Sequence, residues 1–194
     1  IDIVVTYPHW PRAWQVEADW LRFAAEGGYV REVISHFLFF SARVLGPLRL
    51  VWARPTWPAD PALCETHVAA RLENSAGVPV SVFGSVGGVQ PDRQEVTVTG
   101  SARSWRISDF YRTAVSDGGP FEAAGEEPED PRATSLRAQL DHLARMMRGE
   151  PHRLATVEEA LDVMVAKKIG GLLVVDDGKV VGIFAERDAL MKRL

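Results

Sequence analysis

The middle of the chain alternates in polarity with a period of two, and this pattern restricts the fold more than any other feature. Valine-rich runs follow one another across residues 48–110, and prolines, glycines and asparagines separate them. The runs read LRLVWA, THVAARLE, VPVSVFGS, EVTVTG and SWRISDF. Because successive side chains of a strand point to opposite faces, such a series predicts an antiparallel meander.

The segments on either side of the meander predict the helices that cover it. Residues 1–7 are β-branched and predict one further strand. Gly28–Leu45 repeats apolar residues at helical spacing and is followed by Gly46-Pro47, and Thr134–Arg148 is a second amphipathic helix. The acidic, proline-rich segment 117–132 is expected to be a solvated connector. A sheet with one half-polar face needs a cover on the other, so we expect an α+β fold, a mostly antiparallel open sheet covered by helices.

The end of the chain predicts a small unit of its own. Thr156–Glu159 forms a capping box at a helix start, and Gly170-Gly171 ends that helix. Two valine-rich runs flank Asp177-Gly178, which predicts a hairpin, and AERDALMKRL predicts a closing helix. We therefore expect a helix–hairpin–helix unit over residues 155–194, after a first domain over residues 1–154.

Composition excludes several classes of protein. The chain has 194 residues and a formal net charge of −4, which argues against a nucleic-acid partner because phosphate binding needs a clustered basic surface. No apolar stretch approaches the roughly 20 residues that span a bilayer, so no membrane role is expected. Cys64 is the single cysteine, which fits a reducing cytoplasm, and the histidines show no metal-ligand spacing, so no metal site is expected. The chain starts at Ile1 inside a strand-like run, so we expect a piece of a longer or trimmed protein.

One carboxylate and one histidine lie four residues apart in GGYVREVISHFLFF, residues 27–40. In a helix this spacing places Glu32 and His36 on the same side. A histidine titrates near neutral pH and a carboxylate can orient it, so the two residues could act as acid–base groups. The same spacing also describes a structural pair worth roughly a few tenths of a kcal/mol. The pattern alone favours this structural interpretation.

The order of the segments resembles the C-terminal domain of the glucose–fructose oxidoreductase and inositol dehydrogenase family (Gfo/Idh/MocA). The resemblance covers Ile1 to about Val163 and rests on GGYVREVISHF, the following LGPL, the valine-rich meander and LDHLARMMRGEPHRLATVEEALDV. Family members are two-domain enzymes, in which a Rossmann domain binds NAD or NADP and an α+β domain supplies substrate contacts and the oligomer interface. The resemblance implies an oxidoreductase that acts on a sugar, polyol or similar hydroxyl compound, and a homo-oligomer assembled through the sheet face.

The same resemblance assigns roles to residues of the first helix. The family motif is Asp-x-x-x-His, often with a second aspartate three residues later. Glu32 and His36 match the first two positions, and Phe39 stands where the second aspartate would be. The resemblance implies that His36 is an acid–base group or substrate ligand and that Glu32 orients it. The active-site lysine of the family belongs to the Rossmann half, outside this chain.

The sequence offers candidate residues for contacts with substrate but no motif for binding the dinucleotide cofactor. Trp10, Trp14 and Trp20 could line a sugar-like pocket, although core or interface packing is the simpler interpretation. Arg12 follows Trp10 closely and could reach a polar substrate or lie in a solvated loop. No G-x-G-x-x-G occurs, and GSVGG at 84–88 lies between strand runs and is expected to be a turn. The chain by itself should therefore not bind NAD or turn over substrate.

Residues 151–194 resemble one cystathionine-β-synthase (CBS) motif, carried by ATVEEALDVMVAKKIGGLLVVDDGKVVGIFAERDALMKRL. In that family an aspartate after the second strand contacts the ribose of an adenine nucleotide, which implies Asp188 and AMP or ATP; Ala185 replaces the usual hydroxyl residue. CBS motifs work in pairs, and this chain has one. Two alternatives to the oxidoreductase part therefore remain: an adenine-nucleotide-sensing module that pairs by homodimerisation, and an inactive fragment or fusion joined at ATVEEALDV.

Overall fold

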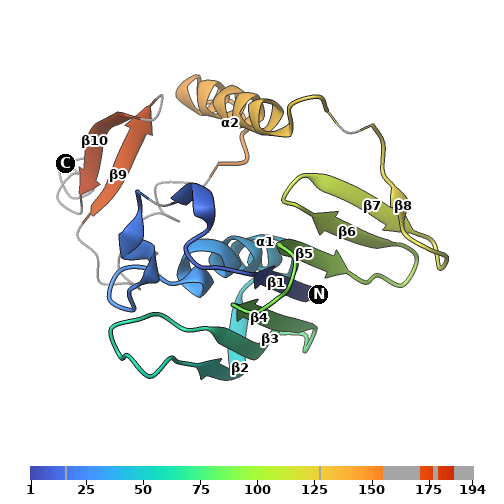
Figure 1. Ribbon diagram of the computed structural model, residues 1–194. Coiled ribbons are helices and arrows are strands. Elements are labelled where there is room, and N and C mark those ends of the chain that lie inside the picture. The colour runs from blue at the N-terminus through green and yellow to red at the C-terminus, as the bar shows by residue number, and fades with distance from the viewer. Residues whose placement is uncertain (16, 127, 155–170, 177–178, 186–194) are drawn as a thin grey trace. The chain divides into compact units, whose positions relative to one another are not determined.

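The computed structural model describes residues 1–15, 17–126, 128–154, 171–176 and 179–185 (Figure 1). The chain forms two compact units, Ile1–Glu127 and Pro128–Leu194. The domain boundary expected at residue 154 stays a prediction. None of the helices in the described ranges is long and apolar enough to cross a membrane.

An eight-stranded open sheet dominates the first unit, with the strand order β2-β3-β4-β1-β5-β6-β7-β8. The strands are β1 (Asp2–Tyr7), β2 (Leu48–Thr56), β3 (His67–Asn74), β4 (Pro79–Val86), β5 (Arg93–Val98), β6 (Ser104–Ser108), β7 (Arg112–Ser116) and β8 (Glu122–Ala123). Neighbouring strands are antiparallel except β1 and β4, which run parallel. The expected α+β class with a mostly antiparallel open sheet is confirmed.

The position of β1 is the main difference from a simple meander. Val4 lies opposite Phe83 of β4 on one side and opposite Glu95 of β5 on the other. The connection from β4 to β5 therefore passes over an inserted strand and does not close a hairpin between neighbours. A central place suits β1, because Val5 and Tyr7 are completely buried and a strand gains most from its apolar side chains where it is most protected.

The first helix packs on one face of the sheet and builds the core. It begins with a π-helical turn, Val30–Ile34, and continues as α1 (Ser35–Leu45), so the helix expected over Gly28–Leu45 is confirmed with a wider first turn. Gly46 ends α1 with a φ of 80°. The buried core joins this helix to β1, β3, β4 and β5; its members are Ile3, Val5, Tyr7, Tyr29, Val33, Ile34, Phe37, Val68, Ala70, Val80, Val82 and Val96.

Two segments that the sequence left irregular contain short regular elements. The tryptophan-rich segment holds the 3-10 turns η1 (Ala13–Gln15) and η2 (Asp19–Arg22). The segment expected to be a connector contributes β8, which pairs with β7 at Val115 and Glu122. The prediction of an entirely irregular connector is therefore wrong at β8, where backbone pairing with an existing strand edge overrides a polar composition.

The second unit contains a helix and a hairpin. The helix, α2 (Pro131–Met147), begins three residues before the expected Thr134, because Asp130 Oδ1 accepts a hydrogen bond from Ala133 N–H at 3.0 Å and proline is favourable in the first turn. β9 (Gly171–Asp176) and β10 (Lys179–Ala185) pair antiparallel, which confirms the expected hairpin. The predicted capping box at Thr156–Glu159, the turn residues Asp177-Gly178 and the closing helix lie outside the described residues.

Candidate functional site

Glu32 and His36 lie at the junction of the π turn and α1. Glu32 belongs to the π turn and is half-buried, whereas His36 is in the first turn of α1 and is exposed. Among the described residues, no hydrogen bond or ion pair joins the two side chains. The wider turn explains part of this separation, because a π-helical turn holds more residues than an α-helical turn. The structure thus places both residues together on the first helix without direct contact, and their roles stay predictions.

A buried carboxylate holds the start of this helix. Glu65 lies just before β3 with 8% of its surface exposed, and its Oε1 accepts a hydrogen bond from Val30 N–H at 2.9 Å. The first N–H groups of a helix lack partners within it, so this carboxylate satisfies one of them. A Cβ atom on Gly28 would lie 3.1 Å from both Glu65 oxygens, and Gly28 has a φ of 107°. Sequence reasoning missed Glu65; its signal is an acid two residues before a strand.

Trp10 packs between two core tyrosines. Its Nε1–H donates to the Leu21 carbonyl at 2.9 Å. Its ring lies 5.8 Å from the Tyr7 ring and 6.2 Å from the Tyr29 ring, measured between centroids. The indole is half-buried, so packing against the core accounts for one side of it. Trp14 and Trp20, by contrast, are 66% and 44% exposed.

Arg12 shares a neighbour with Trp10. Its guanidinium carbon lies 4.9 Å from the Tyr7 ring centroid and 4.7 Å from that of Trp14. Its Nε–H donates to Gln15 Oε1 at 3.3 Å. Trp10 and Arg12, the two residues predicted to contact substrate, both lie on the segment that follows β1. Both contact Tyr7, the last residue of β1.

A cavity of about 370 Å³ opens beside Trp10, and we call it the strand-end cavity. It lies at the ends of the parallel strands β1 and β4, and its polar wall includes His9, Arg22, Glu65 and Thr66. Its volume is within the range of small-molecule sites. Glu32, His36 and Arg12 do not belong to its walls.

The phenols and the thiol near this cavity are difficult to ionise. The hydroxyl groups of Tyr7 and Tyr29 are buried and have no hydrogen-bond partner within the described part of the chain. Burial raises the pKa of Tyr7 to about 12, although the positive charge of Arg12 partly offsets this effect. Burial and the nearby Glu65 carboxylate raise the pKa of Tyr29 well above its usual range. Burial also raises the pKa of Cys64, which is buried as expected and stays a thiol near neutral pH.

The glycine-rich segment does not fit a dinucleotide. A dinucleotide phosphate site needs a strand, a glycine-rich turn and then a helix whose N-terminus faces the phosphates. Here Gly84 belongs to β4, Gly87 and Gly88 form the turn after it, and the next element is β5. The turn expected over residues 84–88 is therefore confirmed only at Gly87 and Gly88, because residues 84–86 belong to β4. These residues provide no helix N-terminus for a phosphate. The predicted nucleotide ligand Asp188 lies outside the described residues.

Comparison with solved structures gives oxidoreductases of one type. KijD10, a 3-ketoreductase from Actinomadura kijaniata solved with NADP and TDP-benzene, is 18% identical with a TM-score of 0.59 over 82% of this chain and 49% of its own. The dehydrogenase MviM from Clostridium difficile is 10% identical with a TM-score of 0.63, over 87% of this chain and 52% of its own. The WlbA dehydrogenase from Bordetella pertussis, solved with NADH and UDP-GlcNAcA, is 15% identical with a TM-score of 0.57, over 87% and 51%.

These neighbours are Gfo/Idh/MocA-type oxidoreductases. This chain shares their fold. It spans about half the length of the solved chains it matches. The family model for the CBS domain matches residues 150–194, and no curated protein matches the sequence. Both resemblances expected from the sequence, the Gfo/Idh/MocA fold and the CBS motif, are thereby confirmed.

Proposed function

We propose that this chain is the substrate-binding and oligomerisation part of an NAD(P)-dependent oxidoreductase that acts on a sugar, polyol or similar hydroxyl compound. The observation that carries the proposal is the shared Gfo/Idh/MocA fold, with Glu32 and His36 on its first helix. KijD10 and WlbA were solved with nicotinamide cofactors and with TDP-benzene or UDP-GlcNAcA, which supports a substrate related to sugar nucleotides. A cytoplasmic location is part of the proposal.

His36 is proposed as the group that exchanges a proton with the substrate hydroxyl. Its imidazole is exposed, so a substrate can reach it, and histidine is suited to proton transfer near neutral pH. Glu32 precedes it by four residues and is proposed to orient it once substrate is bound, because acid–base contacts that are long in a free enzyme often tighten in the complex.

Trp10 and Arg12 are proposed as substrate contacts. The Trp10 N–H is already bonded to Leu21, so its contribution would be the apolar ring in the wall of the strand-end cavity. Arg12 uses its Nε–H on Gln15, and its terminal N–H groups suit hydroxyl or phosphate oxygens. Aromatic faces and guanidinium groups together are typical of sites for polar, ring-shaped ligands.

The nicotinamide cofactor is proposed to bind to a Rossmann half outside this sequence. The glycine-rich turn after β4 does not fit a dinucleotide, and the active lysine implied by the family belongs to the other half. We therefore expect this chain alone to be inactive, and we assign no catalytic step to it without its partner domain.

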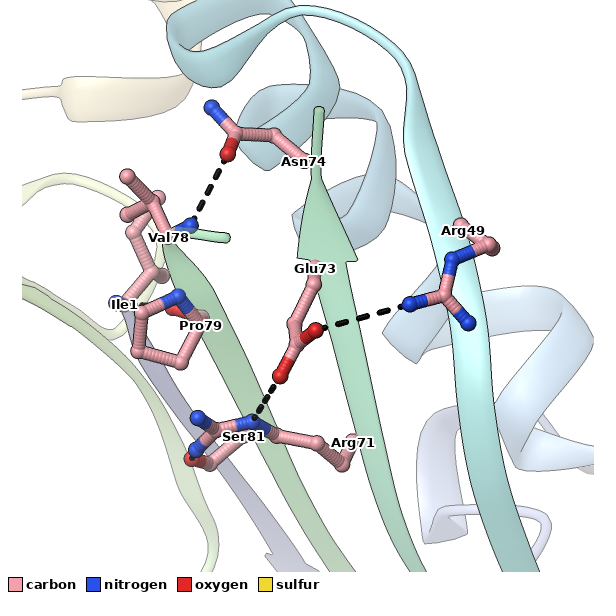
Figure 2. A network of polar contacts seen from close by, with 8 residues as sticks. All are labelled: Ile1, Arg49, Arg71, Glu73, Asn74, Val78, Pro79 and Ser81. Carbon is pink, nitrogen blue, oxygen red and sulfur yellow. Dashed lines mark hydrogen bonds and ion pairs between the residues drawn. The ribbon is translucent and has the colours of Figure 1, made fainter. Parts of the chain in front are cut away.

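The face of the sheet opposite the first helix is the proposed homo-oligomer interface. Phe83 and Trp52 lie on this face with 49% and 46% of their surfaces exposed. Beside them Glu73 forms ion pairs with Arg49 at 3.5 Å and with Arg71 at 3.6 Å (Figure 2). A surface with exposed aromatic residues and a polar border resembles the anatomy of protein interfaces.

Joining a Rossmann half from a Gfo/Idh/MocA enzyme to this chain would test the proposal. His36→Ala should lower turnover about a hundredfold or more, and Glu32→Gln should lower it less, since general acid–base groups contribute on this scale. His67→Ala is the matched control, because His67 is an exposed histidine on β3. Unchanged turnover in His36→Ala, with activity of the joined protein established, would refute the catalytic role.

The CBS match favours a second candidate function, adenine-nucleotide sensing at residues 150–194. Calorimetry of the chain with AMP, ATP, NADH and NADPH separates the two functions. We expect at most weak adenylate binding, lost in Asp188→Ala, and no dinucleotide binding. Micromolar affinity for NADH would overturn the assignment of the cofactor to another domain, and tight AMP binding would favour the sensing module.

A further inference from the structure

A second cavity lies between the start of the first helix and the sheet edge formed by β2 and β3, and we call it the edge cavity. Its volume is about 340 Å³, at the small end of the range for small-molecule sites. Apolar side chains form most of the described wall, among them Pro55, Trp57 and Val68, and the charged groups that the described residues contribute to it are Glu65 and Arg31. Neither Glu32 nor His36 lines it, so it is separate from the proposed catalytic pair.

The edge cavity exists because β2 extends beyond the cover of the helix. The side chains of β2 are exposed along nearly its whole length. Pro55 lies opposite Val68, and Val68 lies opposite Gly84. The Tyr29 ring packs against Gly84 on the face of the sheet that the helix covers. Pro55 and Val68 therefore share the helix-side face of the sheet. An apolar floor is left open there, next to the helix start.

Glu65 and Arg31 differ in how deeply they lie in the edge cavity. Glu65 is 8% exposed, and among the described residues no cation forms an ion pair with its carboxylate. Its Oε1 accepts from Val30 N–H, which leaves lone pairs on both oxygens for a further donor. Arg31 is exposed, and its Nη1–H donates to the Ala25 carbonyl at 3.2 Å. The cavity thus has a negative charge inside and a positive charge at its rim.

We propose that the edge cavity binds a small zwitterion of the amino-acid type with an apolar side chain. The ammonium group lies at the Glu65 carboxylate, the ligand carboxylate at the Arg31 guanidinium, and the apolar body against Trp57, Pro55 and Val68. A simple cation is repelled by Arg31 and a simple anion by Glu65, so the two opposite charges together select a zwitterion. The Trp57 ring adds attraction for the ammonium group or the apolar body.

Calorimetric titration of the full chain with three probes tests the proposal: L-phenylalanine, 2-phenylethylamine and 3-phenylpropanoate. The three share an aromatic body and differ in charge. Phenylalanine should bind saturably, about tenfold more tightly than either singly charged probe, because a hydrogen-bonded charged group is worth about that factor. Absence of saturable phenylalanine binding, or equal binding of 2-phenylethylamine, would overturn the zwitterion assignment.

Variants assign the binding to the named residues. Glu65→Gln keeps an oxygen acceptor for Val30 N–H while removing the charge, and should weaken phenylalanine binding about tenfold. Arg31→Met should remove the preference for phenylalanine over 2-phenylethylamine. Glu122→Gln, an exposed acid on β8, is the matched control and should bind as the parent does.

A substitution at an exposed position, which should not affect folding, completes the test. Trp57 is 54% exposed, so Trp57→Ala should leave the melting temperature nearly unchanged and still weaken phenylalanine binding. Parent-like binding in Trp57→Ala, or in a folded Glu65→Gln, would overturn the assignment of the ligand to this cavity. Equal loss in Glu122→Gln would do the same, since it would show a response to net charge alone. The proposal does not depend on the oxidoreductase assignment, because these probes contain no oxidisable hydroxyl group and the measurement is binding.

Discussion

The hydroxyl group of Tyr29 lies over Gly84, so that a Cβ atom on this glycine would come within 2.8 Å of the phenolic oxygen. The same Cβ would lie 2.8 Å from Cδ1 of Ile34. Gly84 is in β4, a strand interior where glycine usually weakens a sheet. Here the absent side chain leaves room for the Tyr29 ring and for Ile34, which brings the start of the first helix close to the sheet.

Gly84→Ala should destabilise the protein by about 1–3 kcal/mol, because an inserted methyl group in a packed core forces its neighbours to move. Denaturant unfolding of the parent and variant measures this free energy. Gly119→Ala is the matched control, since a Cβ there meets no atom within 4 Å and the backbone has no unusual φ. Equal stability of the two variants would show that the contact between Tyr29 and Gly84 is not tight in solution.

Tyr7→Phe should make the protein less sensitive to alkali. Burial raises the pKa of Tyr7 from 10.0 to about 12 in the folded protein, so the unfolded chain loses this proton at lower pH. Stability from the protonated phenol is complete below about pH 10 and is lost as the pH rises towards about 12. The variant should therefore lose less unfolding free energy across this window, with a difference on the order of 2 kcal/mol.

Near neutral pH the same substitution should be neutral or slightly stabilising. The Tyr7 hydroxyl is buried and meets no hydrogen-bond partner among the residues that the structure describes, so its removal deletes an unsatisfied polar group. Urea unfolding at about pH 8 and about pH 11 provides both measurements. Tyr111→Phe, at a position 39% exposed, is the control and should not change the alkaline slope. An identical slope in the parent and Tyr7→Phe would contradict the raised pKa.

Local patterns in the sequence were sufficient for most elements but not for their arrangement. The run VPVSVFGS became β4, and the two runs around Asp177-Gly178 became a hairpin, because alternation and turn residues act over a few positions. The insertion of β1 between β4 and β5 depends on pairing of Val4 with residues about 80 to 90 positions away, which no local pattern encodes. The π turn at Val30–Ile34 likewise had no local signal.

The residues of the candidate site were likewise predicted only where a local pattern or the family resemblance indicated them. Spacing and family resemblance placed Glu32 and His36 on the first helix, as observed. Glu65 was missed because its role comes from a contact with Val30, 35 positions away in the sequence. For Trp10 the sequence pattern allowed both substrate stacking and core packing. The hydrogen bond to Leu21 supports packing at one edge of the ring. The position of Trp10 in the wall of the strand-end cavity leaves substrate stacking as a prediction.

Asn74 should matter more for stability than the ion pairs beside it. Its Oδ1 accepts from Val78 N–H at 2.9 Å (Figure 2) and from Ala76 N–H at 3.0 Å. Its Nδ2–H donates to the Leu45 carbonyl at 3.0 Å. One amide thus closes the turn between β3 and β4 and ties it to the end of α1. Asn74→Ala should lower the unfolding free energy by about 2 kcal/mol, since three hydrogen bonds are lost.

Two further variants separate these contributions. Asn74→Asp keeps the acceptor and loses the donor to Leu45, so it should cost about half as much. Glu73→Gln removes the partly exposed ion pairs with Arg49 and Arg71 and should change stability by about 0.5 kcal/mol or less. Chemical denaturation gives all three values, and a larger loss in Glu73→Gln than in Asn74→Ala would reverse this ranking.

Phe110 should be a position where glycine is better than alanine. Phe110 has a φ of 65° in the turn between β6 and β7, a region that costs a residue with a side chain about 1 kcal/mol or more. The residue is held there because its ring stacks on Phe37 of α1, with centroids 5.5 Å apart and planes 14° apart. Both Phe110→Ala and Phe110→Gly lose this stacking, but only glycine relieves the strain of the backbone, so Phe110→Gly should be the more stable variant by about 1 kcal/mol.

Phe39, exposed on α1, is the control position, where the alanine variant should be more stable than the glycine variant by about the same amount. Thermal unfolding of the four variants decides the matter, and an alanine preference at both positions would refute a strained turn held in place by Phe37.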